Sequence, residues 1–401
     1  MRLRIVVQRY GSEILGGAER HAALIASLLS PHHDLEVWTT TAGDYQTWSP
    51  AYPEGFSTVE GIRVRRFAVD TGRTERWGEL SGLLHEGFEP SSLARLPRLR
   101  REQFAGRVRR WPLPLQEAFI REQGPEAGGL MRALEEESYD RVLFFTYLYP
   151  TTYDGLERVD PARARVVPTL HDEPTAYLPA FGARLERARL LCSTASERAL
   201  LTRLYPERTI DSKVIGYGID LPEAEGADPG GADPFLLYAG RVDSHKGRDE
   251  LLDWYRALRA TDPRAPRLIL IGEPDPELPA LPGLEQLGFV DEARKIGLMR
   301  DALALVQPSP FESLGIVLLE AMALGTPLIV NACSPVMVEH CRRGRSGLWV
   351  RDGAEFASAV RRLQDSPHLT RALGTGGARY VEDFYSLDRY RGRLLEEFPP
   401  D

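Results

Sequence analysis

The chain has 401 residues, 43% of them hydrophobic and 27% charged, a composition typical of a globular protein long enough for two or three domains. Its formal net charge of −8 argues against a general attraction to nucleic acid or to an acidic membrane surface. Because there is no uncharged apolar run of about 20 residues, and because the three cysteines lack metal-ligand spacing, we expect a protein of the reducing cytoplasm without a membrane-spanning helix.

The N-terminal third begins with a strand, a glycine-bearing loop and a helix. Residues 3–7 form a short apolar run, Gly16 and Gly17 lie in the next loop, and residues 18–29 place apolar side chains on one helical face. Paired glycines let a backbone approach a phosphate closely. The spacing is not that of a dinucleotide fingerprint, and a tight turn without a ligand is the alternative. Further strands are predicted at 35–40, 62–67, 141–145 and 166–170.

Residues 70–130 interrupt this alternation and are predicted to form a helical insertion. Within it, the segment 95–110 carries seven arginines interleaved with apolar residues at roughly helical spacing, and Pro97 should start or kink a helix. One interpretation is a solvated amphipathic helix. The functional alternative is a surface for an anionic acceptor or for peripheral contact with a membrane.

His171 follows the predicted strand at 166–170. Loops after the carboxyl ends of strands in an open α/β sheet face the ligand crevice, so His171 is a candidate contact for a reacting group. A structural or merely exposed histidine is the alternative. Asp172 and Glu173 are metal-ligand types, but no second histidine completes a site, and no Asp-x-Asp pair occurs. We therefore expect no bound metal.

A polar stretch at 223–234 marks a domain boundary, after which a second alternation begins. The predicted strands are 235–239, 267–271, 304–307 and 327–330. The predicted helices are 249–259, 291–300 and 316–324. Two Rossmann-like, doubly wound domains that face one another across a cleft are therefore expected.

The loop at 240–247 follows the first strand of this second half. After Gly240, both Arg241 and Lys246 can face the ligand crevice, where two cations would neutralise a pyrophosphate. Only three of the 50 basic residues are lysines, so a lysine here favours function over a salt-bridged loop. The loops with Gly272 and with Phe289 and Val290 either line a base pocket or are ordinary turns.

The segment 309–327 carries Glu312 in a turn and Glu320 further along a helix. At about 1.5 Å per residue the two carboxylates lie roughly 10–12 Å apart, comparable with the span of a nucleotide sugar from hexose to ribose. The helix N-terminus between them favours a phosphate. Because this helix is apolar nearly all round, Glu320 should be buried and should need a partner. Chance spacing is the alternative.

Together these motifs resemble those of the retaining GT-B glycosyltransferases of family 4. The motifs are Gly-Gly-Ala-Glu-Arg-His at 16–21, Tyr-Ala-Gly-Arg through Lys-Gly at 238–247, and the two glutamates. The resemblance covers nearly the whole chain and is strongest at 235–350. It implies an α/β fold of GT-B architecture. The implied parts are an acceptor-side domain at 1–222 with the insertion at about 70–130, a donor domain at 235–385, and a C-terminal helix at 386–401 that crosses back to the first domain.

The resemblance also implies roles for individual residues. Arg241 and Lys246 would bind the donor diphosphate, Glu312 the donor sugar and Glu320 the ribose. The residues implied as catalytic are His171, Arg241, Lys246 and Glu312. The residues implied in donor binding are Gly16, Gly17, Gly240, Arg241, Lys246, Gly272, Phe289, Val290, Glu312, Ser313, Leu314, Gly315 and Glu320. Two departures from the family pattern are Ala332 to Pro335, in place of a glycine pair before Glu339, and Leu314, in place of phenylalanine.

The implied function is the metal-independent, retaining transfer of a hexose from a nucleotide-diphosphate sugar to a hydroxyl acceptor, without a cofactor. Synthesis of surface polysaccharide or lipid-linked glycan is the expected setting. A nucleotide-sugar 2-epimerase of the same fold and an inactive nucleotide-sugar-binding partner subunit are the alternatives. The complete set of Arg241, Lys246, Glu312 and Glu320 argues against the inactive subunit.

Overall fold

The computed structural model describes residues 1–14, 16–86, 98–220 and 233–400, with only the backbone described for 98–102 and 245. The described chain forms two compact units. Unit 1 takes residues 1–86, 98–217 and 390–400, and unit 2 takes residues 218–220 and 233–389. The boundary predicted at 223–234 lies largely outside the described residues.

Unit 1 is built on an eight-stranded sheet in which every neighbouring pair is parallel except the edge pair β3–β4. In spatial order the strands are β3 (Gly55–Val59), β4 (Ile62–Phe67), β2 (Asp34–Thr40), β1 (Arg2–Val6), β5 (Arg141–Phe145), β6 (Ala164–Val167), β7 (Arg189–Cys192) and β8 (Ser212–Val214). The chain order reverses between β1 and β5, which is where open α/β sheets bind ligands.

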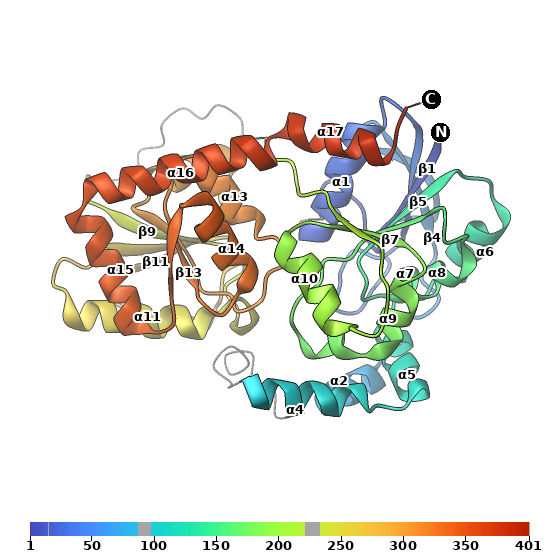
Figure 1. Ribbon diagram of the computed structural model, residues 1–401, viewed down its shortest axis with the longest axis horizontal. Helices are drawn as coiled ribbons and strands as arrows, with labels where there is room; N and C mark the ends of the chain where they lie inside the picture. Colours follow the sequence, from blue (N-terminus) through green and yellow to red (C-terminus); the bar gives the residue numbers. More distant parts are fainter. Residues whose placement is uncertain (15, 87–97, 221–232, 401) are drawn as a thin grey trace. The chain divides into compact units, whose positions relative to one another are not determined.

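Helices cover both faces of this sheet (Figure 1), which explains why its central strands are apolar throughout. On one face, α1 (Gly17–Leu29) buries Ala22, Ile25 and Leu29. The other helices before β8 are α2 (Glu75–His85), α4 (Arg98–Arg109), α5 (Leu113–Gln123), α6 (Gly128–Glu136), α7 (Pro150–Tyr153), α8 (Gly155–Arg158), α9 (Pro179–Leu185) and α10 (Ala195–Leu204), with a 3₁₀ turn at Pro174–Tyr177. Helices α2, α4 and α5 occupy the described part of 70–130.

Unit 2 is built on a six-stranded, wholly parallel sheet. Its spatial order is β11 (Leu284–Gly288), β10 (Arg267–Ile271), β9 (Phe235–Ala239), β12 (Ala304–Gln307), β13 (Leu328–Asn331) and β14 (Gly347–Val350). The helices are α11 (Arg248–Thr261), α12 (Glu292–Asp301), α13 (Ile316–Ala323), α14 (Pro335–Gly344), α15 (Gly353–Asp365) and α16 (Pro367–Tyr385), with a 3₁₀ turn at Ser244–Lys246. The predicted strands and helices of this half are confirmed to within two residues at each end.

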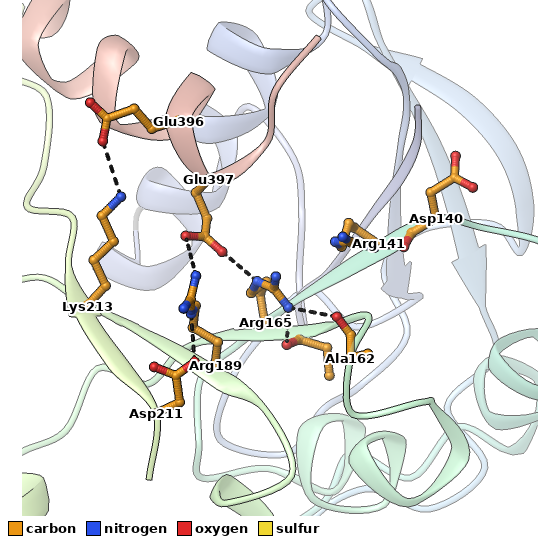
Figure 2. A network of polar contacts seen from close by, with 10 residues as sticks. Asp140, Arg141, Ala162, Arg165, Arg189, Asp211, Lys213, Glu396 and Glu397 are labelled. Atoms are coloured by element: carbon orange, nitrogen blue, oxygen red, sulfur yellow. Dashed lines mark hydrogen bonds and ion pairs between the residues drawn. The ribbon is translucent and has the colours of Figure 1, made fainter. Parts of the chain in front are cut away.

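The last helix, α17 (Leu387–Glu397), belongs to unit 1 from Tyr390 onward and packs in the same core as α1. Figure 2 shows how its end is held: Glu397 lies 2.6 Å from Arg165 Nε and 3.3 Å from Arg189 Nη1, and Lys213 Nζ lies 3.2 Å from Glu396. Near its start, the Tyr390 hydroxyl lies 2.6 Å from His21 Nε2. Burial lowers the pKa of His21 to about 3, so this contact is made by a neutral ring.

Among the described residues, no helix is both long and apolar enough to cross a membrane. The arginines of the 95–110 segment whose side chains are described are partly held by the chain itself. Arg107 pairs with Glu86, and Arg109 Nη2 donates to the carbonyl oxygen of Leu204 at 3.1 Å and lies over the Tyr177 ring. These contacts favour the structural interpretation of that segment.

Candidate functional site

In unit 2, the loops that follow β9 and β12 flank the point where the chain order of the sheet reverses. Lys246 lies in the first loop and Glu312 in the second, and their side chains meet: Lys246 Nζ lies 2.8 Å from Glu312 Oε1. Both side chains keep some exposure to solvent. The structure therefore places two of the predicted site residues together at the edge where ligands bind.

Backbone geometry holds these two loops against each other. The Asp243 carboxylate accepts the Lys246 N–H at 2.8 Å and so caps the 3₁₀ turn. Gly247 has a φ of +81°, and a Cβ there would lie 2.5 Å from the carbonyl oxygen of Pro308. That oxygen also accepts the Asn331 amide at 2.7 Å. Only glycine at 247 permits this approach, which fixes the spacing between the Lys246 and Glu312 loops.

Arg241 lies in the same loop as Lys246, with its guanidinium 3.7 Å from the Asp243 carboxylate. The Tyr238 hydroxyl donates to the Arg241 carbonyl oxygen. Gly272, predicted as a pocket residue, has a packing role: with a φ of +117°, its Cβ would lie 2.3 Å from the Gly240 carbonyl oxygen. Phe289 follows β11 and is 67% exposed. An aromatic ring presented to solvent at this edge suits a planar base.

The N-terminus of α13 opens at the same edge as Glu312. Gly315 caps it in the left-handed conformation, with a φ of +73°. The first backbone hydrogen bond of the helix runs from the Leu318 N–H to the Gly315 carbonyl oxygen. The N–H groups of Gly315, Ile316 and Val317 come before it and are not used by the hydrogen bonds of the helix. Such N–H groups and the helix dipole together favour an anion.

A buried histidine fixes this helix start. His340, in α14, has Nε2 2.8 Å from the Leu314 carbonyl oxygen and Nδ1 3.4 Å from the Tyr380 hydroxyl. Burial lowers the pKa of His340, so its ring is neutral. A neutral ring that meets a carbonyl through Nε2 must carry its proton there. The Leu314 C=O and the Gly315 N–H belong to one planar trans peptide and point in opposite directions. Because His340 holds this C=O, the Gly315 N–H points away from His340.

Glu320 is buried in α13, as expected, and its partner is Lys295 of α12. Lys295 Nζ lies 3.2 Å from Glu320 Oε1 and 2.7 Å from Glu292 Oε1. Each of the two predicted glutamates therefore pairs with a lysine: Glu312 with Lys246, and Glu320 with Lys295. Lys295 is the partner that the buried Glu320 carboxylate was expected to need. The contact of Glu320 with the ribose stays a prediction.

In unit 1, the Gly16–Gly17 loop follows β1. A Cβ at Gly16 would lie 2.0 Å from Glu19 Oε2, and Glu19 is held by Arg9 Nη2 at 2.6 Å. At Gly17 nothing lies within 4 Å of where a Cβ would be. A side chain at Gly16 would therefore have to displace the Glu19 carboxylate, whereas Gly17 faces open space and leaves the start of α1 accessible.

His171 follows β6 on the same edge of this sheet. Its Nδ1 lies 3.8 Å from Glu173 Oε1, which also accepts the Tyr147 hydroxyl at 3.1 Å. The Asp172 carboxylate lies 2.7 Å from Arg203 Nη2 and also accepts the Tyr177 hydroxyl. These two carboxylates are engaged in the scaffold around His171.

Glu197 supports the His171 loop and was not predicted. Its carboxylate, buried in α10, accepts the N–H groups of Leu170 at 2.7 Å and Ser193 at 2.6 Å. The adjoining Thr169 has a positive φ of 52°, which a non-glycine residue adopts only when its surroundings hold it there. Burial outweighs the hydrogen bonds and raises the pKa of Glu197 to about 7. The capping pattern Thr194-x-x-Glu197 was the available signal.

Comparison with known proteins relates unit 2 to glycosyltransferases. Residues 233–366 match the protein family described as glycosyl transferases group 1. A D-inositol 3-phosphate glycosyltransferase of Frankia alni is 34% identical over 239 residues, which are 51% of this chain and 57% of that protein. The chain spans about half the length of the curated relatives it matches.

Solved structures share the fold at low identity. Sucrose-phosphate synthase from Thermosynechococcus elongatus is 18% identical with a TM-score of 0.65, over 99% of this chain and 98% of that one. Anabaena Alr3699/HepE in complex with UDP-glucose is 16% identical with a TM-score of 0.64, over 99% of both chains. The predicted fold class, α/β with two Rossmann-like domains of GT-B type, is confirmed.

Proposed function

We propose that the chain is a retaining glycosyltransferase that moves a hexose from a nucleotide-diphosphate sugar to a hydroxyl acceptor. The observation that carries this proposal is the Lys246–Glu312 contact at the strand-order reversal of unit 2. The match of residues 233–366 to glycosyl transferases group 1 and the UDP-glucose bound to Anabaena HepE support it.

Unit 2 supplies the donor site in this proposal. The diphosphate lies against Arg241, Lys246 and the N-terminus of α13, which offer two cations and aligned N–H groups. Glu312 accepts hydrogen bonds from the hexose hydroxyls. Glu320 accepts them from the ribose, and its pairing with Lys295 orients its carboxylate.

The chemistry is leaving-group stabilisation. As the bond from the anomeric carbon to the diphosphate oxygen breaks, negative charge grows on that oxygen, and the cations and N–H groups are already in place to stabilise it. The acceptor hydroxyl attacks the anomeric carbon from the face that the diphosphate leaves, and it gives its proton to the departing diphosphate oxygen. The new bond therefore retains the configuration. We propose that no metal or cofactor takes part, because Arg241 and Lys246 supply the positive charge that a metal would, and because the sequence lacks an Asp-x-Asp pair.

Unit 1 supplies the acceptor side, with His171 near the reacting anomeric carbon. Gly16 and Gly17, at the start of α1, remain proposed contacts of the donor. The curated relatives are named for D-inositol 3-phosphate. WaaG, another protein of similar fold, is described as involved in lipopolysaccharide biosynthesis. We place this chain in cytoplasmic synthesis of a surface or lipid-linked glycan.

The test is to incubate the protein with each of a set of nucleotide sugars, with and without hydroxyl acceptors. NMR would then follow both nucleoside diphosphate release and the anomeric configuration of the product. Transfer with retention supports the proposal. An inverted product would refute the mechanism, and conversion of the donor to its 2-epimer without any acceptor would identify an epimerase instead.

A further inference from the structure

Arg73 is a half-buried cation that the fold surrounds with aromatic rings. It follows β4, so it lies at the carboxyl edge of the unit 1 sheet, the same edge as Gly16 and His171. Its guanidinium carbon lies 4.1 Å from the centroid of the Trp77 ring and 5.9 Å from that of Trp48. Stacking on indole faces holds the planar guanidinium in one orientation.

No carboxylate among the described residues forms an ion pair with Arg73. Its Nε is buried without a hydrogen-bond partner there, and so is the Nε1 of Trp77 beside it. Two other half-buried arginines of unit 1 have an ionic partner: Arg9 pairs with Glu19 at 2.6 Å, and Arg165 with Glu397 at 2.6 Å. Arg141 and Arg187 form no ion pair with a described carboxylate, but each donates to a backbone carbonyl. Because an uncompensated buried charge is costly, an unpaired guanidinium is expected where a ligand supplies the negative partner.

The nearby acid Asp44 does not serve as that partner. Its carboxylate accepts the N–H groups of Gln46 at 2.8 Å and Thr47 at 2.7 Å and of Ser49 at 3.1 Å, as well as the Thr47 hydroxyl. These hydrogen bonds lower the pKa of Asp44 to about 2. Asp44 is thus committed to closing its own loop and acts on Arg73 only through longer-range electrostatic attraction, while burial lowers the pKa of Arg73.

Tyr149 connects Arg73 to the surroundings of His171. Its ring packs edge-on against Trp48, with centroids 5.0 Å apart. Its hydroxyl lies within electrostatic reach of Arg73, Arg9, Glu19 and Glu173, and burial raises its pKa to about 12. Glu173 contacts His171 and Glu19 lies beside Gly16, so Arg73 belongs to the same group of side chains as His171, which the proposal above places on the acceptor side.

We propose that Arg73 binds an anionic group, a phosphate or a carboxylate, on the acceptor. The proposal rests on the transferase function above and names the acceptor class. The guanidinium fork donates two parallel hydrogen bonds to the oxyanion. The Trp48 and Trp77 rings hold the fork in place, and the neutral Tyr149 hydroxyl is a further donor. The acceptor is a hydroxyl compound that also carries negative charge.

Binding of acceptor probes measured by calorimetry tests this site without any turnover. The probes are inorganic phosphate, glucose 6-phosphate, glucuronate and glucose. We expect at least one anionic sugar to bind about 10–100-fold more tightly than glucose, the factor that a charge-assisted pair supplies. Arg73→Met should remove this preference, and Arg73→Lys should restore part of it. Glucose 6-phosphate and glucuronate distinguish a phosphate from a carboxylate acceptor.

Arg65→Met is the matched control. Arg65 also lies in unit 1 and stacks on aromatic rings, 4.7 Å from the Phe67 centroid, but it pairs with Glu137. This variant should keep the preference for anions. Equal anion binding by Arg73→Met and the unaltered protein, or no preference over glucose, would overturn the proposal. Anion binding without any nucleotide-sugar binding would instead refute the transferase function and leave the Arg73 site standing.

Discussion

The buried His340 ring lies 2.8 Å from the carbonyl oxygen of Leu314, the residue just before the Gly315 cap of α13. This contact joins two elements of unit 2 that are 26 residues apart in the chain. It orients the peptide whose N–H opens toward the proposed diphosphate. His340 would therefore shape the proposed anion site without touching the substrate.

Replacing His340 should weaken donor binding through this peptide. His340→Ala removes the hydrogen bond to Leu314 and should cost about 1–3 kcal/mol of unfolding free energy. Donor affinity should fall about 10-fold. His340→Gln, whose amide can donate to the same carbonyl, should recover part of the affinity. Calorimetric titration with the donor and thermal melting check both effects. If His340→Ala lost stability but bound the donor normally, His340 would have a structural role alone.

Glu312 and Glu320 should bind different parts of the donor, Glu312 the hexose and Glu320 the ribose. Glu312→Gln should lower turnover and alter the choice of sugar, because it loses an ionised acceptor for the hexose hydroxyls. Glu320→Gln should mainly weaken nucleotide affinity, while Lys295 keeps its partner Glu292 at 2.7 Å. Separate measurement of donor Kd and turnover checks the division. Unchanged donor affinity in Glu320→Gln would return Glu320 to a purely structural role.

Glu197 should make stability depend on pH in a defined direction. Its pKa is raised from 4.5 to about 7, so the folded state keeps a proton that the unfolded state has lost between those values. The contribution of Glu197 therefore lowers the free energy of unfolding as pH rises from 4.5 to 7, by about 3 kcal/mol in total. Glu197→Gln should remove this part of the slope. Denaturant unfolding at pH 5 and pH 7 measures it, and an unchanged slope in the variant would contradict the assignment.

Gly17 should tolerate a side chain that Gly16 does not. Gly16→Ala would place its Cβ 2.0 Å from Glu19 Oε2 and should displace the Arg9–Glu19 pair, with a loss of about 1–3 kcal/mol in stability. Gly17→Ala meets nothing within 4 Å and should melt at the temperature of the unaltered protein. If the start of α1 contacts a ligand, Gly17→Ala should still reduce activity. Full activity in that variant would remove Gly17 from the site.

Much of the fold follows from apolar periodicity. The runs at 235–239, 267–271 and 304–307 are apolar because both faces of a parallel sheet are covered, and each became a strand. β11 was not predicted, because its sequence Leu-Glu-Gln-Leu-Gly is half polar, as an edge strand permits. In unit 1, the sequence also did not predict β7 and β8, two short strands at the edge of the sheet opposite β3.

The candidate site was predictable only where its residues carry local signals. Lys246 was found because lysine is rare in this chain, and Glu312 because it lies in a glycine-bearing turn before an apolar helix. His340 and Glu197 act over 26 and 27 residues, and no spacing pattern encodes such contacts. The capping pattern Thr194-x-x-Glu197 marks only the start of α10. Only the structure, which gives the neighbours of the Arg73 side chain, shows that no described carboxylate forms an ion pair with it.

The central claim is that Lys246 and Glu312 form part of a nucleotide-sugar site, and Lys246→Ala tests it most directly. The measurement is release of nucleoside diphosphate from the preferred donor, with Lys213→Ala as control, since Lys213 belongs to unit 1 and pairs there with Glu396. We predict a loss of about 10²–10³-fold in turnover for Lys246→Ala, as for removal of one oxyanion-stabilising group. Lys213→Ala should stay within twofold of the unaltered protein. Near-normal turnover in a folded Lys246→Ala protein would contradict the account.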